Sequence, residues 1–205
     1  AVARVERQAP GEGGREGTVR VEGEGDPILL AERRSATFQR RKILLVSTPK
    51  TKGLSRIERE YEASDQRRFF VPCPHCGYAQ WLKFDRLRWQ KGRPETAEYH
   101  CEGCDAAIAE HHKTAMLEGG EWRATATAAD PTTVGYHLSA LYSPIGWLSW
   151  ERIVRAWDAA QGSDEAIKAF RNTILGETWV ETGEAPDSPE PCFFTSLKNW
   201  GLKRA

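Results

Sequence analysis

Two close pairs of cysteines constrain the fold more than any other feature of this sequence. The first pair is Cys73-Pro-His-Cys76, the second is Cys101-Glu-Gly-Cys104, and 24 residues separate them. Two residues between cysteines allow one tight turn to direct both sulfur atoms toward a single ion, and two such turns complete a tetrahedron of thiolates. The spacing therefore predicts that Cys73, Cys76, Cys101 and Cys104 bind one Zn²⁺ ion.

The alternative for these four cysteines is a pair of disulfides or four free thiols. Residues 1–20 lack the apolar centre of a secretion signal, so the sequence does not indicate the oxidising compartment in which disulfides form. Four thiolates leave no open coordination position, so the predicted zinc ion is structural. We interpret the neighbouring His75 and His100 as groups that orient the ligands or face solvent, and the distant Cys192 as a bystander.

The composition fits a folded protein, and its charges are unevenly distributed. Hydrophobic residues make up 40% of the 205 residues, which is enough for a core, and 29 basic residues balance 29 acidic ones. Residues 33–68 nevertheless contain eleven Lys or Arg and only four Asp or Glu. This stretch could contact a phosphate backbone, or it could be a solvated surface with paired Arg and Glu side chains. No apolar run approaches 18 residues, so the sequence predicts no membrane span.

The apolar pattern divides the chain into five segments. Residues 1–26 are rich in Gly, Glu and Arg, and we interpret them as a disordered leader or as a stretch translated outside the native frame. Residues 27–70 combine helical and strand patterns, and residues 71–108 contain the cysteine pairs. Residues 109–183 mix further helices and strands, and residues 184–205 form a Pro-rich, irregular tail.

Four local patterns give sharper predictions. The apolar run Ile43–Val46 has the length and composition of a strand that is buried on both faces. Ser55 and Glu58 have the spacing of a capping box, in which each side chain accepts from the other residue's amide. Ser149 and Ser163 each precede an apolar helical stripe and are predicted N-caps. The chain contains no zinc-protease, nucleophile-elbow or phosphate-loop motif, so the residues alone predict no catalytic centre.

Several longer segments resemble one known family. About residues 22–186 are similar, in register, to the large terminase subunit of tailed bacteriophages, of the lambda gpA type. The segments that carry this resemblance are Glu24–Phe38, Arg41–Pro49, Lys52–Ile57, Val71–Gly77, Glu110–Lys113, Gly120–Arg123, Gly135–Pro144 and Asn172–Trp179. The resemblance implies a motor that packages double-stranded DNA into a procapsid, with an ATPase domain followed by a nuclease domain.

The same resemblance implies roles for particular residues and for other molecules. Ile43–Val46 is similar to the ATPase strand that follows the Walker B strand, and Ser47-Thr48-Pro49 is similar to the motif that couples ATP hydrolysis to DNA movement. From the residues alone, Ser47 and Thr48 could also be an ordinary turn at a strand end. The implied partners are the small terminase subunit and the portal of the procapsid, in the cytoplasm of the bacterial host. ATP and Mg²⁺ are implied only for the full-length family.

The combined prediction is an α/β fold, in which part of a P-loop-type ATPase sheet carries an inserted four-cysteine zinc ribbon and C-terminal helices. The phosphate-binding loop, the Walker B acids and the nuclease domain are not recognised, so we predict no ATPase or nuclease activity from this chain alone. The chain begins at Ala1 without an initiator Met, and we interpret it as part of the packaging motor. One alternative is a stand-alone zinc ribbon that binds nucleic acid or protein without catalysis, and another is a non-functional remnant that folds only around zinc.

Overall fold

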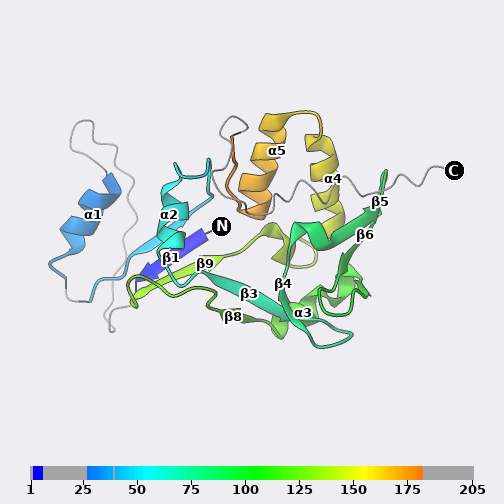
Figure 1. Ribbon diagram of the computed structural model, residues 1–205, viewed down its shortest axis with the longest axis horizontal. Coiled ribbons are helices and arrows are strands. Elements are labelled where there is room, and N and C mark those ends of the chain that lie inside the picture. The colour runs from blue at the N-terminus through cyan, green and yellow to red at the C-terminus, as the bar shows by residue number, and fades with distance from the viewer. Residues whose placement is uncertain (1, 7–26, 39, 182–205) are drawn as a thin grey trace.

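The structure is a computed structural model that describes residues 2–6, 27–38 and 40–181 (Figure 1). The larger of its two sheets has the strand order β2-β1-β9-β3-β4, and β8 pairs with β3 beside this path. All pairings in this sheet are antiparallel except that of β3 with β9. Its strands are β1 (Val2–Glu6), β2 (Leu44–Ser47), β3 (Arg67–Pro72), β4 (Ala79–Trp81), β8 (Glu121–Arg123) and β9 (Thr133–His137).

The second sheet, β5-β6-β7, is antiparallel, and helix α4 packs against β6. Its strands are β5 (Leu87–Gln90), β6 (Arg93–His100) and β7 (Ala107–Ile108). The helices are α1 (Pro27–Ser35), α2 (Arg56–Glu62), α3 (Lys113–Glu118), α4 (Trp150–Ala160) and α5 (Asp164–Phe170). Short helical turns are η1 (Phe84–Arg86), η2 (Glu110–His112), η3 (Ala140–Tyr142) and the π-helical η4 (Arg171–Leu175). None of the helices in the described part of the chain is long and apolar enough to cross a membrane.

Strand β1 corrects the prediction of a disordered leader for residues 2–6 alone. Val2–Glu6 lies between β2 and β9, and Val2 is opposite both Ser47 and His137. A strand with a neighbour on each side can form backbone hydrogen bonds along both edges, and this stabilisation does not depend on an apolar repeat in its own sequence. Residues 7–26 lie outside the described part of the chain.

Strand β2 is less buried than its sequence predicts. Leu44 and Val46 are 64% and 61% exposed, whereas Leu45 packs against Ile57 and Tyr61 of α2. The prediction of a strand buried on both faces is wrong, because β2 is an edge strand of the described sheet and α2 covers one side of it. The mixed α/β class is confirmed, while the P-loop type of the sheet stays a prediction.

The predicted helix starts are correct, but one of the predicted caps does not form. The Ser149 hydroxyl accepts from the Arg152 amide, and the Ser163 hydroxyl accepts from the Ala166 amide, as expected for N-caps. Ser55 has the extended backbone of an N-cap but makes no side-chain cap bond. The Glu58 carboxylate instead accepts from the Gly53 amide at 2.8 Å, so it stabilises the turn before α2 and leaves the capping box unformed.

One hydrophobic core joins the cysteine-bearing turns to the C-terminal helices. Trp150, Ile153 and Val154 of α4 are fully buried, and they belong to the same cluster as Cys73 and Cys101. The indole Nε1 of Trp150 donates to the backbone oxygen of Leu141 at 3.1 Å. Because the two cysteines are part of this core, the folding of the cysteine turns and of the helical region should be coupled.

His137 of β9 links the sheet to the segment after η4. The guanidinium of Arg68 can only donate, so Nδ1 of His137 accepts at 2.6 Å and Nε2 donates to the Gly176 oxygen at 3.1 Å. Burial, together with the positive charge of Arg68, lowers the pKa of His137 to about 3. The imidazole is therefore neutral at physiological pH.

This depressed pKa predicts an acid-sensitive contribution to stability. Between pH 6.5 and 3 the unfolded chain binds a proton at His137 and the folded chain does not, so stability falls as pH falls through this window. The limiting slope from this one group is about 1.4 kcal/mol per pH unit. A His137→Gln variant should show a shallower decline in the free energy of unfolding between pH 6.5 and 4.5. Equal pH slopes for the variant and the parent would contradict this assignment.

Candidate metal centre

The first cysteine turn follows directly from β3. The Cys73 amide donates to the Tyr78 oxygen at 2.9 Å, and the Gly77 amide donates to the Cys73 oxygen at 2.9 Å. The His75 amide points to the Cys73 sulfur at 3.4 Å. Gly77 has a φ of 72°, a left-handed conformation that glycine adopts without a steric penalty. These bonds form a tight turn that presents the sulfur atoms of Cys73 and Cys76 on the same side.

The second turn repeats the first at the same sequence offsets. The Cys101 amide donates to the Ala106 oxygen at 3.1 Å, the Asp105 amide donates to the Cys101 oxygen at 3.0 Å, and the Gly103 amide points to the Cys101 sulfur at 3.3 Å. The left-handed position is occupied by Asp105, with a φ of 54°. Two equivalent turns therefore face each other, each with a buried first cysteine and an exposed second one.

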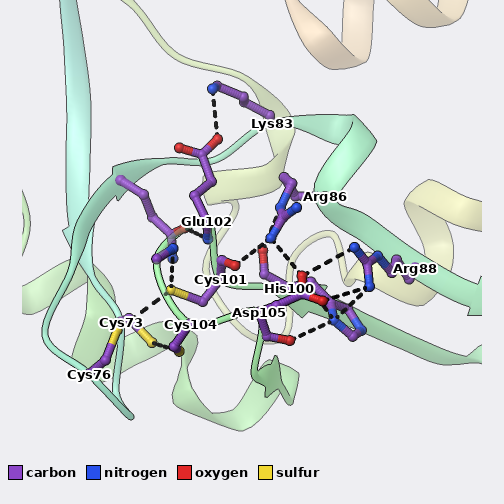
Figure 2. A network of polar contacts seen from close by, with 12 residues as sticks. Cys73, Cys76, Lys83, Arg86, Arg88, His100, Cys101, Glu102, Cys104 and Asp105 are labelled. Atoms are coloured by element: carbon purple, nitrogen blue, oxygen red, sulfur yellow. Dashed lines mark hydrogen bonds and ion pairs between the residues drawn. The ribbon is translucent and has the colours of Figure 1, made fainter. Parts of the chain in front are cut away.

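The four sulfur atoms converge on one point (Figure 2). All of them lie within 4.8 Å of one another, with 4.0 Å between Cys73 and Cys104 and 3.7 Å between Cys76 and Cys101. Four sulfurs around one ion at a Zn–S distance of about 2.3 Å would lie about 3.8 Å apart. A disulfide needs about 2.05 Å, and all four cysteines are free, so the disulfide alternative does not fit.

The closely packed sulfur atoms shift one another's pKa values in opposite directions. Burial raises the pKa of Cys101, but the amides of Cys104 and Gly103 outweigh this effect and lower it to about 7. The Tyr78 amide favours the thiolate of Cys76, yet the surrounding sulfurs raise its pKa to about 12. A proton held on one sulfur while another ionises is the behaviour expected of a closely packed group of acids. A divalent cation would remove the conflict, so the donor set can hold a metal ion.

Polar groups hold the second turn from both sides (Figure 2). The buried Gln80 of β4 accepts from the Glu102 amide at 2.7 Å, and Lys83 pairs with the Glu102 carboxylate at 2.7 Å. Arg86 and Arg88 approach the same turn from η1 and β5. The outer shell of the site is therefore built from elements that precede the second cysteine pair in the sequence.

The two histidines lie outside the sulfur cluster, as interpreted from the sequence. His75 Nε2 lies 3.1 Å from the Ala107 oxygen, and His100 Nδ1 lies 3.1 Å from the Asp105 oxygen. A carbonyl oxygen can only accept, so Nε2 of His75 carries a proton in its contact. Nδ1 of His100 also lies 3.2 Å from Nη1 of Arg88, which can only donate, so its two contacts do not assign a proton to it. Both contacts join one part of the metal-binding region to another and thereby help to fix its shape.

Ser47 and Thr48 lie in a different part of the molecule. Both residues are exposed at the end of β2, and the Ser47 hydroxyl donates to the Thr48 oxygen at 3.2 Å. Strands β1 and β9 separate β2 from β3, so the fold does not bring this pair to the cysteine site. A parallel bridge follows, in which the Lys52 amide donates to the Trp179 oxygen and the Trp179 amide donates to the Lys50 oxygen, both at 2.8 Å.

The residues that support the metal site were missed from the sequence, although one signal was available. Alignment of the two turns on their cysteines places Asp105 opposite Gly77, which marks it as a non-glycine residue at a left-handed position. Gln80, Arg86 and Arg88 have no such signal, because their contacts depend on how distant strands pack.

Comparisons with known proteins place the chain in a family. The family model "Phage terminase large subunit gpA, ATPase domain" matches residues 16–122, and "Terminase large subunit gpA, endonuclease domain" matches residues 133–192. The chain therefore belongs to the gpA family of phage terminase large subunits. It is similar to "Terminase, large subunit" of Enterobacteria phage P21, with 35% identity over 192 residues, and to the protein of the same name from Escherichia phage lambda, with 34% identity over 191 residues.

These matches cover most of this chain but a minor part of each relative. They include 82% of this chain, and they span 29% of the P21 protein and 30% of the lambda protein. No solved structure matches the chain. Residues 133–192 match the endonuclease model, so the prediction that this chain lacks the nuclease domain is wrong for these residues.

The structure does not separate the two matched regions. Strand β9, which lies in the endonuclease match, pairs with β3 of the ATPase match and also with β1, which precedes both matches. Trp179 likewise forms a bridge with Thr51. Residues of both matched regions therefore contribute strands to one hydrogen-bonded sheet.

Proposed function

We propose that this chain is part of a motor that packages double-stranded viral DNA, and that its four cysteines hold a structural zinc ion. The observation that carries the packaging role is the pair of gpA matches, which lie in order along the chain. In this role, the complete enzyme would bind ATP and Mg²⁺. Its partners would be the small terminase subunit and the portal, in the cytoplasm of the bacterial host. The chain would supply part of the ATPase core and the start of the endonuclease region.

The geometry of the sulfur atoms supports zinc as the ion. Four thiolates at tetrahedral spacing form a closed set, which is the arrangement of structural zinc sites and leaves no position for a substrate. When bound, the ion would neutralise part of the thiolate charge and cross-link the two turns. Cys73, Cys76, Cys101 and Cys104 would hold it, and the amides of His75 and Gly103 would orient the two buried sulfurs.

A stand-alone zinc ribbon is the weaker alternative. Such a module would need a core of its own, whereas Cys73 and Cys101 are buried in the same cluster as Trp150 and Phe170 of the C-terminal helices. This shared core favours a zinc site that stabilises a larger domain.

The packaging role can be tested by replacing the matching segment of the P21 relative with this chain. We expect the chimaeric terminase to package DNA in a defined packaging assay, because 82% of the chain aligns with that segment. A chimaera that folds and retains zinc but packages no DNA would contradict the proposal.

The coupling role of Thr48 gives a second prediction in the same chimaera. Loss of the hydroxyl in Thr48→Ala should lower the packaging rate by about tenfold or more, which corresponds to about 1.4 kcal/mol of lost transition-state stabilisation. Thr37→Ala, at another exposed threonine of this chain, is the matched control and should package at the parental rate. Equal rates for the two variants would reject Ser47-Thr48 as the coupling motif.

A further inference from the structure

Arg86 contacts both sides of one predicted metal ligand. It is the last residue of η1, and its Nε donates to the His100 oxygen at 3.0 Å. Its Nη2 donates to the oxygen of Cys101 and, at 2.8 Å, to the carboxylate of Asp105. One side chain therefore joins the residue before Cys101, Cys101 itself and the residue after Cys104. The planar guanidinium suits this role because its donors have fixed relative directions.

Asp105 occupies the position at which the second turn reverses. Its φ of 54° is a left-handed conformation, which Asp adopts more readily than most residues but less readily than glycine. Its amide donates to the Cys101 oxygen, and its carboxylate also accepts from Arg88 at 3.2 and 3.3 Å. The side chain is thus held between two arginines while its backbone closes the turn (Figure 2).

The first cysteine turn has glycine, Gly77, at the position that corresponds to Asp105. Gly77 has the same left-handed backbone and the same amide bond to the first cysteine of its pair. A glycine would therefore satisfy the backbone at position 105 as well. The presence of Asp at this position calls for a role of its carboxylate beyond the turn itself.

We propose that Arg86 and Asp105 form a clamp that holds the second cysteine turn in its metal-binding geometry and so slows the loss of zinc. This inference rests on the zinc site proposed above. Both residues are positioning residues, since they act through the backbone of Cys101 and not on the ion. The clamp also fixes the metal site to η1 and β5, the segment that leads into the β5–β6 hairpin.

The expected effect follows from the general behaviour of groups that orient metal ligands. Substitution of such groups typically weakens metal affinity by about 10- to 100-fold. Arg86→Gln removes the guanidinium group, which makes all three contacts. Asp105→Gly keeps a residue that readily adopts the left-handed backbone and removes only the carboxylate. If the clamp acts as proposed, both variants should lose Zn²⁺ to a chromogenic chelator at least about tenfold faster than the parent chain.

The matched control is Arg93→Gln, at the tip of the same hairpin. Arg93 is 61% exposed and pairs with Glu95, so its loss should leave the rate of zinc release unchanged. The effects of Arg86→Gln and Asp105→Gly should be less than additive in the double variant, because the contact between the two side chains is already lost in each single variant. Absorption of the Co²⁺-loaded proteins would show whether all four sulfurs still bind.

The outcomes separate the clamp from the zinc site itself. If the parent chain binds neither Zn²⁺ nor Co²⁺, the proposed zinc site is wrong. If the parent binds tightly and Asp105→Gly releases zinc as slowly or more slowly, only the backbone conformation matters and the clamp is overturned. Fast release from both clamp variants, with parental release from Arg93→Gln, is the result that the clamp predicts.

Discussion

Replacement of Cys101 by serine is expected to unfold the cysteine turns and to destabilise the helical region with them. Cys101 has no exposed surface and belongs to the main core, so its substitution removes a ligand and leaves a hydroxyl group inside the cluster. Structural zinc contributes about 10–16 kcal/mol of binding free energy in small zinc domains. That range is comparable with the 5–15 kcal/mol by which typical domains are stable, so we expect most of the folding free energy of this region to be lost.

Circular dichroism and limited proteolysis would measure this effect. In the Cys101→Ser chain, protease sites should open within residues 72–108, and the thermal transition should broaden or disappear. Treatment of the parent chain with a strong chelator should reproduce the same pattern. Cys192→Ser is the matched control, because this cysteine is not one of the four predicted ligands. If Cys101→Ser unfolds at the parental temperature, the ion does not stabilise this fold.

The second large effect is expected at the ion pair of Lys113 and Glu110. Glu110 of this pair also contacts the first residue of α4. Lys113 is 1% exposed, and its Nζ donates to Glu110 Oε1 at 2.6 Å and to the Ser143 oxygen at 3.2 Å. The same carboxylate oxygen of Glu110 accepts from the Trp150 amide at 3.0 Å, one of the first amides of α4 that have no partner within the helix. Glu110 therefore neutralises a buried cation and caps a helix at once.

Glu110→Gln should lower the free energy of unfolding by about 2–3 kcal/mol. Loss of one partner from a buried pair costs about 3–5 kcal/mol, and partial exposure of Glu110 places the expected value below that range. Glu118→Gln, at an exposed acid of the same helical segment, should change it by less than about 0.5 kcal/mol. Urea denaturation monitored by Trp fluorescence would give both values.

A further substitution separates the charge effect from the cap. Lys113→Met, combined with Glu110→Gln, removes the buried cation and should recover much of the stability lost in Glu110→Gln alone. If Glu110→Gln proves as stable as the parent, the pair contributes little and the fold has another anchor for α4. A double variant no more stable than Glu110→Gln would assign the loss to the helix cap.

The features that could be predicted from the sequence are those set by neighbouring residues. The cysteine pairs define their own turns, and Ser149 and Ser163 start their helices by hydrogen bonds to amides three residues ahead. In each case the interaction lies within a few residues, where spacing alone determines the geometry.

The features that were missed depend on distant parts of the chain. Val2–Glu6 becomes a strand because β2 and β9 flank it, and Leu44 is exposed because β2 lies at the sheet edge. Glu58 could have capped its own helix, but Gly53 offers its amide from the preceding turn. Arg86 reaches the metal site only after η1 packs beside the second cysteine pair. None of these contacts leaves a periodic or motif-like signal.

The metal content of the purified chain tests the central claim most directly. Elemental analysis after gel filtration should find one zinc ion per chain, and replacement by Co²⁺ should produce the strong sulfur-to-metal charge-transfer absorption of a tetrahedral four-thiolate site. The Cys76→Ser and Cys104→Ser variants should lose this spectrum while Cys192→Ser keeps it. A folded chain without bound metal, in which four described cysteines react freely with a thiol reagent, would contradict the account.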